Sequence, residues 1–278
     1  MLAGESLCGY TVAMLRFLVF ILSAFATLGA EKVGPALPQA HAHNDYEHTR
    51  PLLDALSHGF TSVEADIYLV ERKLLVAHDR EDLKPERTLR ALYLDPLREL
   101  PRAKKRIFES GETLTLLIDI KTEAEPTYAV LREVLDGYRE MLTHFEKDKM
   151  ETNAVTVILS GNRPGHLLMS DGPTRLAGID GRLAEVTPRR NLSASWIPLV
   201  SDNWNNHFKW RGNGALPDDE REKLRSLVQQ IHSEGRRIRF CATPDNESAW
   251  AELRRAGVDL INTDKLNELA EFLRRQSP

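Results

Sequence analysis

Histidines and carboxylates alternate with apolar runs along one stretch of this sequence, Ala40–Asp79. Four side chains with useful chemistry each lie at or just beyond the end of an apolar run: His43, Glu64, Asp66 and His78. An imidazole can gain or lose a proton near neutral pH, and oxygen ligands such as carboxylates bind hard divalent cations. These residue types in this order therefore predict acid/base chemistry assisted by a metal ion.

Glu64 and Asp66 are two residues apart in an apolar run. Side chains two apart on a β-strand project from the same face, so the two carboxylates repel each other unless a cation lies between them. Two solvated acids on an exposed strand are the alternative. The helix-like segment Pro51–His58 and then Gly59 precede this strand, a context in which parallel strands are buried on both faces. Buried carboxylates need a partner, which favours a metal site.

Eight segments have the apolar character of β-strands, and segments with helical periodicity separate them. The predicted strands are Pro38–His41, Thr61–Tyr68, Leu114–Ile120, Ala154–Ser160, Leu176–Ile179, Trp196–Val200, Arg237–Ala242 and Leu260–Thr263. The predicted helices are Pro51–His58, Thr127–Phe145, Gly165–Met169, Asp218–Ser233, Ser248–Ala256 and Leu266–Arg274. Strands that alternate with helices favour a parallel sheet, so the pattern predicts an α/β fold, a single (β/α)8 TIM barrel.

Two further segments belong to no predicted barrel strand. Leu74–Ala77 is predicted to form an extra hairpin arm with its turn at Glu71–Lys73, and Leu83–Ile107 is predicted to form short helices over one end of the barrel. A barrel has its active site at the carboxyl ends of its strands. Polar residues follow these ends and not the amino ends, so the candidate chemistry lies where a barrel places it.

The order His, Glu-x-Asp and His-Asp, each after an apolar strand, resembles the superfamily of phosphatidylinositol-specific phospholipases C and glycerophosphodiester phosphodiesterases. The segments HAHNDY, SVEAD, RTLRALYLDPL, LLIDIKT and VTVILSGNRP resemble its branch named for altered inheritance of mitochondria. The resemblance runs from about His41 to Asp264. It implies one barrel domain of the phospholipase C-like phosphodiesterase type over residues 31–278.

The resemblance also implies roles for single residues. His43 and Asn44 match the His-Asn pair of eukaryotic phospholipases C, in which the asparagine helps to hold the metal. Asp119 stands where glycerophosphodiesterases carry a glutamate, and this shorter side chain resembles the sphingomyelinase D pattern. The implied ligands of a divalent cation, Mg²⁺ or Ca²⁺, are Asn44, Glu64, Asp66 and Asp119.

Two histidines are predicted to exchange protons with the substrate. His43 is predicted to be the base, and His78, which matches the second histidine of the superfamily, is predicted to be the acid, with the reverse assignment as the alternative. His41 lies on the same strand face as His43 and is its rival, but the sequence around His43 favours the latter. Asp79 could orient His78.

Three more residues are predicted to bind the substrate. Lys121 lies two residues after Asp119 on the same strand face and would offset the charge of a phosphate. Arg163 could grip a phosphate through two parallel hydrogen bonds, and Trp204 could cover an apolar or sugar group at the barrel mouth. A surface position is the alternative for Lys121, and packing within loops is the alternative for Arg163 and Trp204.

The charge of the chain excludes one class of partner. Its net charge is −4 and its pI is about 6.2, whereas proteins that bind nucleic acid cluster Lys and Arg on one face. Nucleic acid is therefore not expected as a partner, and no obligate protein partner is evident. The expected partner is a small phosphodiester or a lipid headgroup, with transient contact to a membrane surface.

The N-terminal apolar run Phe17–Ala30 follows an arginine and ends in small residues, which is the layout of a secretory signal. The predicted signal peptide spans residues 1–30, with Met14 as an alternative start of translation, and it predicts a secreted or periplasmic protein. The alternative is a retained single-span membrane anchor, for which the run is short.

These features together predict a secreted, metal-dependent phosphoric diester hydrolase. It would act on a glycerophosphodiester or a phospholipid-type substrate by acid/base catalysis with two histidines. The alternative is a non-catalytic secreted barrel that binds phosphorylated ligands or lipid headgroups. A binding protein needs no acid and base, so the pair of histidines favours the enzyme.

Overall fold

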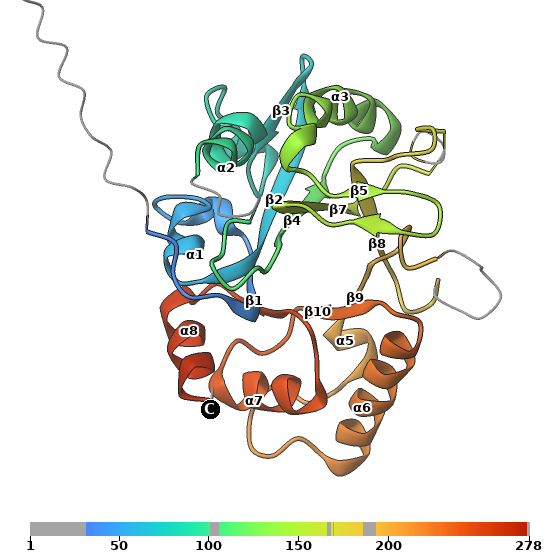
Figure 1. The fold of residues 1–278 in the computed structure, drawn as a ribbon. Helices are drawn as coiled ribbons and strands as arrows, with labels where there is room; N and C mark the ends of the chain where they lie inside the picture. The colour runs from blue at the N-terminus through green and yellow to red at the C-terminus, as the bar shows by residue number, and fades with distance from the viewer. Residues whose placement is uncertain (1–31, 101–105, 166–167, 169, 186–192, 277–278) are drawn as a thin grey trace, which may run out of the picture. The chain divides into compact units, whose positions relative to one another are not determined.

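Eight parallel strands form the centre of this computed structural model (Figure 1). They are β1 (Leu37–Ala42), β2 (Phe60–Val70), β4 (Leu114–Ile120), β7 (Val155–Gly161), β8 (Ala177–Gly181), β9 (Leu199–Asn203), β10 (Arg237–Cys241) and β11 (Ile261–Thr263). Their order in the sheet is β10-β9-β8-β7-β4-β2-β1-β11. A parallel bridge between Arg239 and Leu260 joins the two ends and nearly closes the sheet. The predicted barrel is confirmed.

The structure describes residues 32–100, 106–165, 168, 170–185 and 193–276. They lie in one compact unit, residues 31–278. The predicted signal peptide and its alternative, the membrane anchor, lie outside the described residues and stay predictions. Within the described part of the chain, no helix combines the length and the apolar character needed to cross a membrane.

Helices pack on the barrel because apolar residues repeat along one side of each helix. In α8, Leu266, Leu269 and Leu273 are buried at helical spacing. α7 begins where the Asn246 side chain accepts a hydrogen bond from the first turn, and it ends at Gly257 with φ 86°. The helices are α1 (Leu53–Ser57), α2 (Asp95–Glu99), α3 (Ala124–Asp136), α5 (Trp204–His207), α6 (Asp218–Ser233), α7 (Glu247–Ala256) and α8 (Leu266–Arg275).

β2 extends beyond the barrel as a two-stranded arm with the antiparallel β3 (Lys73–Val76). The predicted hairpin is observed, with Glu71 and Arg72 at its turn in positive φ angles. The predicted turn, Glu71–Lys73, is one residue too long, because Lys73 already pairs with Val70. The N–H of Ala77 then donates to the carbonyl of Asp66, so the chain returns to the end of the barrel just before His78. The remaining short elements are Asp45–Glu47, Arg80–Asp82, the π-helix Arg90–Leu94, Arg139–Met141, β5 (His144–Phe145) and β6 (Met150–Glu151).

One predicted helix is too long. The segment Thr127–Phe145 contains most of α3, but that helix ends at Asp136, with Gly137 as its C-cap. The backbone of Phe145 instead exchanges two hydrogen bonds with Arg175, at 2.8 Å each, so this residue belongs to a short strand. Helical periodicity cannot reveal this end, because pairing with a distant residue decides it.

One predicted strand begins too early. The segment Trp196–Val200 contains the start of β9, but this strand begins at Leu199. The N–H of Trp196 bonds back to the carbonyl of Ser193 in a turn, so this N–H cannot pair in the sheet, and only the Trp196 carbonyl does so by accepting from Ile179 of β8. The helix predicted over Gly165–Met169 lies partly outside the described residues.

The inside of the barrel has an apolar layer and a polar layer. Four buried side chains, three from its strands and one directly before β11, form an apolar cluster of their own: Leu117, Ile158, Leu199 and Leu260. Two residues further along the same strands the side chains are polar: Asp119, Ser160, Ser201 and Asn262. Because residues two apart share a strand face, the polar layer lies next to the apolar layer on the carboxyl side. The apolar layer is therefore the floor of the site.

Candidate active site

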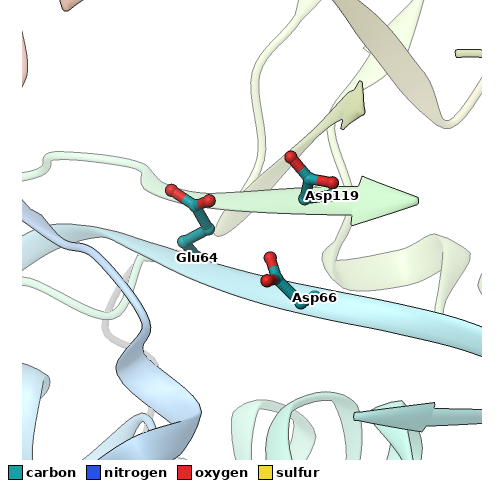
Figure 2. A group of neighbouring side chains, drawn as sticks. All are labelled: Glu64, Asp66 and Asp119. Carbon is teal, nitrogen blue, oxygen red and sulfur yellow. The ribbon is translucent and has the colours of Figure 1, made fainter. Parts of the chain in front are cut away.

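Two neighbouring strands bring three carboxylates together in the polar layer. Glu64 and Asp66 project from β2, and Asp119 projects from β4 as the parallel partner of Asp66. One ligand oxygen from each residue lies within 4.8 Å of the other two. Figure 2 shows the three groups on the same side of the two strands. The shared face predicted for Glu64 and Asp66 is observed, and Asp119 joins them.

A glycine makes room for the Asp119 carboxylate. Gly161 ends β7 with φ +67° next to Asp119 Oδ1 and the carbonyl of Ile120. A Cβ at this position would overlap both atoms, and residues with a side chain rarely adopt this φ. Gly161 therefore allows β7 to approach the carboxylate cluster closely.

The donor set fits a hard divalent cation. Asp66 Oδ1 is buried and has no hydrogen-bond partner among the described residues. Burial, and then the charge of Glu64, raises the pKa of Asp66 to about 6, while the Lys121 ammonium opposes this shift. A cation between the carboxylates would give Oδ1 a partner and favour the charged form. Ligand oxygens of this kind suit Mg²⁺ and Ca²⁺.

Lys121 compensates part of the negative charge. Its Nζ lies 3.0 Å from Asp66 Oδ2 and 3.1 Å from Asp119 Oδ1. Burial lowers the pKa of Lys121, but the charges of Asp66 and Asp119 outweigh burial and raise this pKa above its ordinary value. The amine of Lys121 therefore stays charged. A charged amine is what the predicted contact with a phosphate requires.

Glu64 is held by an arginine and a histidine. Arg239 Nη1 lies 2.6 Å from Glu64 Oε2, and His41 Nε2 lies 3.0 Å from the same oxygen. All three side chains are buried. Burial, and then the charge of Arg239, lowers the pKa of His41 to about 4, so His41 is neutral. His41 Nε2 also lies 2.7 Å from Arg239 Nη1, so His41 is a positioning residue for the pair of Glu64 and Arg239. The arginine is a site residue that the sequence does not reveal.

His43 faces the cavity beside the carboxylates. Its Nδ1 lies 2.8 Å from Oδ1 of Asp264, which directly follows β11. Burial lowers the pKa of His43, but the hydrogen bond to Asp264 and the charge of Glu64 outweigh burial and raise it. With Nδ1 engaged, Nε2 remains for a substrate. The sequence signals Asp264 only as a polar residue after the last predicted strand.

Tyr46 connects Asn44 and His78 to the carboxylates. Its hydroxyl oxygen lies 2.8 Å from Asn44 Oδ1, 2.7 Å from Asp66 Oδ2 and 3.2 Å from His78 Nδ1. Burial and the charge of Asp66 raise the pKa of Tyr46, so the phenol keeps its proton. Asn44 has a φ of 47°, which asparagine tolerates better than most residues. Two predicted site residues therefore converge on Asp66 through a tyrosine that was not predicted.

A cavity of about 670 Å³ lies beside the cluster. The predicted site residues that line it are His43, Glu64, Asp119 and Lys121. The other lining residues come from β7 to β10 and the segments after them, and they are Ser160, Arg182, Ala184, Ser201, Asp202, Asn203, Asn206, His207, Arg239 and Cys241. Two sets of residues at this site are named for the charged groups in them. The carboxylate wall consists of Glu64, Asp66, Asp119 and Lys121. The arginine wall consists of Ser160, Arg182, Ser201 and Arg239.

Arg163 lies away from this cavity. Its Nη1 and Nη2 lie 2.8 Å and 2.9 Å from the two carboxylate oxygens of Glu185, and Nη1 also donates to the carbonyl of Asp180. Arg163 lines a neighbouring cavity of about 860 Å³. Both arms of its guanidinium are used within the protein, which argues against the predicted contact with a phosphate.

The prediction for Trp204 is wrong. The side chain is only 1% exposed and stacks on Phe208 with a distance of 4.0 Å between ring centroids. Its indole N–H donates to the carbonyl of Trp210. Trp204 is therefore part of a buried aromatic cluster and cannot cover a substrate group.

Two solved structures share this fold. A glycerophosphodiester phosphodiesterase from Parabacteroides distasonis superposes with a TM-score of 0.53 over 88% of this chain and 100% of its own, at 14% identity. A glycerophosphodiester phosphodiesterase from Agrobacterium tumefaciens gives a TM-score of 0.50 over 87% and 100%, also at 14% identity. The protein is thus a TIM barrel with the architecture of the glycerophosphodiester phosphodiesterases.

Sequence similarity then defines the family. The AIM6-like phosphodiesterase domain matches residues 32–180, more than half of the 278 residues, and the Glycerophosphoryl diester phosphodiesterase family matches residues 237–267. The chain belongs to the AIM6-like phosphodiesterase domain family. The resemblance seen in the sequence motifs is confirmed.

Relatives of the chain include two fungal proteins named Altered inheritance of mitochondria protein 6. The protein of Eremothecium gossypii is 29% identical over 86% of this chain and 70% of its own length. The protein of Lachancea thermotolerans is 30% identical over 85% of this chain and 66% of its own length. The similarity therefore extends over most of the barrel.

Proposed function

We propose that this protein is a metal-dependent phosphoric diester hydrolase that acts on a glycerophosphodiester or a phospholipid-type substrate. The observation that carries the proposal is the convergence of three carboxylates, a lysine and two histidines at the carboxyl ends of the strands: Glu64, Asp66, Asp119, Lys121, His43 and His78. Membership of a phosphodiesterase domain family supports the reaction class.

The residues of the carboxylate wall would bind the cation and offset the negative charge of the substrate. Glu64, Asp66 and Asp119, together with Asn44, would hold a divalent cation, which when bound polarises the phosphoryl oxygens. Lys121 places a positive charge at the same cavity and offsets the charge of the diester. These residues bind and orient, and none of them needs to move a proton.

The two histidines supply the proton transfers. His43, oriented through Nδ1 by Asp264, accepts at Nε2 the proton of the attacking hydroxyl. The attacking oxygen forms a bond to phosphorus while the bond from phosphorus to the leaving oxygen breaks, and His78 gives its proton to that oxygen. The attacking hydroxyl is water or a neighbouring hydroxyl of the substrate, and the latter gives a cyclic phosphodiester. The reverse assignment of the two histidines is the alternative.

The activity is tested directly with bis-p-nitrophenyl phosphate and a panel of glycerophosphodiesters and phospholipids. We expect turnover of at least one diester, loss of turnover after EDTA, and its return with Mg²⁺ or Ca²⁺. The matched control is Glu64→Gln, which keeps the size of the side chain and removes a ligand charge. An absence of metal-dependent turnover on every diester would overturn the proposal in favour of a non-catalytic barrel that binds phosphorylated ligands.

We further propose that the protein acts outside the cytoplasm, where it touches membrane surfaces transiently if its substrate is a lipid headgroup. The support is the signal-like run Phe17–Ala30. Residues 1–30 fused to an alkaline phosphatase without its own signal should export that reporter. A reporter that stays in the cytoplasm would contradict this location.

A further inference from the structure

Arg182 is a cation in the catalytic cavity to which the proposed mechanism gives no role. It directly follows β8 and lines the cavity together with Asp119, Lys121 and Ser160. Its side chain is 32% exposed, so it is accessible to a ligand. Arg182 lies between the two stretches that match the family descriptions, residues 32–180 and 237–267.

Asp180 fixes one edge of the Arg182 guanidinium. Nη1 of Arg182 donates to Asp180 Oδ2 at 2.9 Å and to the backbone carbonyls of Asp180 and Gly181 at 3.3 Å and 3.0 Å. Asp180 is fully buried, and its Oδ2 also accepts a hydrogen bond from Ser160 Oγ at 2.7 Å. A buried carboxylate with two donors is a rigid anchor, so a ligand of Arg182 would meet a preorganised side chain.

The other edge of this guanidinium is available. Nη2 donates to Ser160 Oγ at 3.3 Å, and Nε makes no hydrogen bond among the described residues. A guanidinium has five N–H donors, so donors of both Nη2 and Nε remain. Ser160 is the parallel partner of Asp119, so Nη2 lies beside the strand that carries a carboxylate of the cluster.

The other two arginines near the site have no such edge. Nη1 and Nη2 of Arg163 both donate to the carboxylate of Glu185. Arg239 also lines the cavity, but it is only 4% exposed, and its Nε and Nη1 contact Ser201 and Glu64. Among these three arginines, Arg182 alone combines a partly exposed side chain at the cavity with unused donors on both Nη2 and Nε.

We propose that Arg182 binds a non-bridging phosphoryl oxygen of the substrate, from the arginine wall, while Lys121 offsets the phosphate charge from the carboxylate wall. Paired N–H donors of a guanidinium match the geometry of phosphate oxygens, which a lysine cannot reproduce. The proposal rests on the proposed function for the identity of the anion as a diester. It predicts in addition that a phosphate anion binds here without turnover.

The first test measures binding of inorganic phosphate to the full chain by isothermal titration calorimetry. Arg182→Met should weaken the affinity about tenfold or more, the loss expected for one hydrogen bond between charged groups. Because Arg182→Met leaves buried Asp180 without its cation, the double variant Arg182→Met/Asp180→Asn is measured as well. Arg132→Met is the matched control, since Arg132 pairs with a carboxylate of its own, Asp171, at 2.7 Å and does not line the catalytic cavity. It should keep the affinity of the wild type.

The second test measures turnover. Arg182→Met should lower kcat/KM for bis-p-nitrophenyl phosphate by about 10²- to 10³-fold, as the loss of one donor to a developing charge does. Arg182→Lys should recover only part of this loss, because it keeps the charge and lacks the paired donors. Added guanidinium ion should restore activity to Arg182→Ala, which it would not do for a variant with a merely structural defect.

The outcomes separate this inference from the proposed function. A wild type that binds phosphate through Arg182 but hydrolyses no diester would overturn the function and support the role of Arg182. A wild type that hydrolyses diesters, with the double variant binding phosphate as tightly as the wild type, would overturn the role of Arg182 and leave the function intact. An equal loss of phosphate affinity in Arg132→Met and Arg182→Met would also overturn it.

Discussion

The carboxylate wall and the arginine wall balance charge in different ways. In the carboxylate wall, one lysine serves two aspartates, and Asp66 Oδ1 still has no partner among the described residues. In the arginine wall, each arginine has a carboxylate of its own, Asp180 for Arg182 and Glu64 for Arg239. The first wall is therefore suited to accept a cation, whereas the second is suited to hold groups in fixed positions.

The largest effect is expected when both walls are left intact and the two histidines that transfer protons are removed. Such variants separate proton transfer from the binding functions of the walls. We expect His43→Ala and His78→Ala each to lower the rate by about 10²- to 10⁴-fold, with metal affinity near that of the wild type because neither residue is a ligand. The variant that lacks the acid should recover much of its rate when p-nitrophenolate is the leaving group, since this group needs little protonation. Steady-state rates and Mn²⁺ titrations measure both effects.

Two outcomes would contradict the assignment of the histidines. Full rates in both variants on diesters with alkoxide leaving groups would remove both from the mechanism. A larger loss in His41→Ala than in His43→Ala would identify His41 as the catalytic residue. We expect His41→Ala to weaken metal affinity instead, because His41 Nε2 contacts both Glu64 Oε2 and Arg239 Nη1 and so positions this pair.

The two walls meet at the pair of Glu64 and Arg239, and the next prediction separates them. Arg239→Met leaves a buried carboxylate without its cation, which should cost about 3–5 kcal/mol of the free energy of unfolding. The double variant Glu64→Gln/Arg239→Met removes both charges and should recover much of this loss. Urea unfolding of the full chain measures the stabilities. If the losses of the two single variants simply add, the two residues are not coupled as the 2.6 Å contact requires.

A smaller effect is expected from the residue that orients His43. Asp264→Asn should lower kcat/KM by about tenfold, the value of one hydrogen bond to a charged group. The effect is not larger because Asp264 is largely exposed and solvent screens its charge. The matched control is Asp259→Asn, since Asp259 lies 2.8 Å from His232 in a similar pair that does not line the cavity. An unchanged rate in Asp264→Asn, or an equal loss in both variants, would show that Asp264 does not orient the base.

The smallest effect concerns a residue that belongs to neither wall. Trp204→Phe removes the hydrogen bond to the carbonyl of Trp210 and should cost about 1 kcal/mol of stability. Because the side chain is buried, KM and kcat should stay within about twofold of the wild type. A selective rise in KM would restore Trp204 as a substrate-binding residue.

The carboxylate wall could be predicted because short sequence patterns determine its geometry. Glu64 and Asp66 share a strand face through their spacing alone, and Asp119 and Lys121 repeat this spacing on the next barrel strand. The pairing of Asp66 with Asp119 then requires only that the two strands be neighbours in register. Strand order in a barrel supplies that condition, so the fold and this half of the site follow from the same pattern.

The arginine wall could not be predicted, because its contacts join distant parts of the chain. Arg239 and Glu64 are 175 residues apart, and the sequence around either residue does not indicate that they form a pair. Among the arginines, the sequence pointed to Arg163, whose position after a strand looks as suitable as that of Arg182. The structure distinguishes them, because Arg163 is bound bidentately by Glu185 and lines a neighbouring cavity, whereas Arg182 lines the catalytic cavity. Tyr46 was missed for the same reason. Its hydroxyl contacts Asp66 and His78, which come together only because the chain folds back after the two-stranded arm.

The ammonium of Lys121 offsets part of the charge that the carboxylate cluster brings into the folded barrel. Three clustered carboxylates would oppose their own burial if they had to enter the folded chain unpaired. Lys121 and Arg239 supply positive charge from within the chain, so the burial of these carboxylates does not depend on a cation alone. If the proposed cation binds here, it can therefore bind after folding, unlike in small domains that fold only with their ion. A chain exported as proposed above would then fold first and take up its metal from the surroundings afterwards.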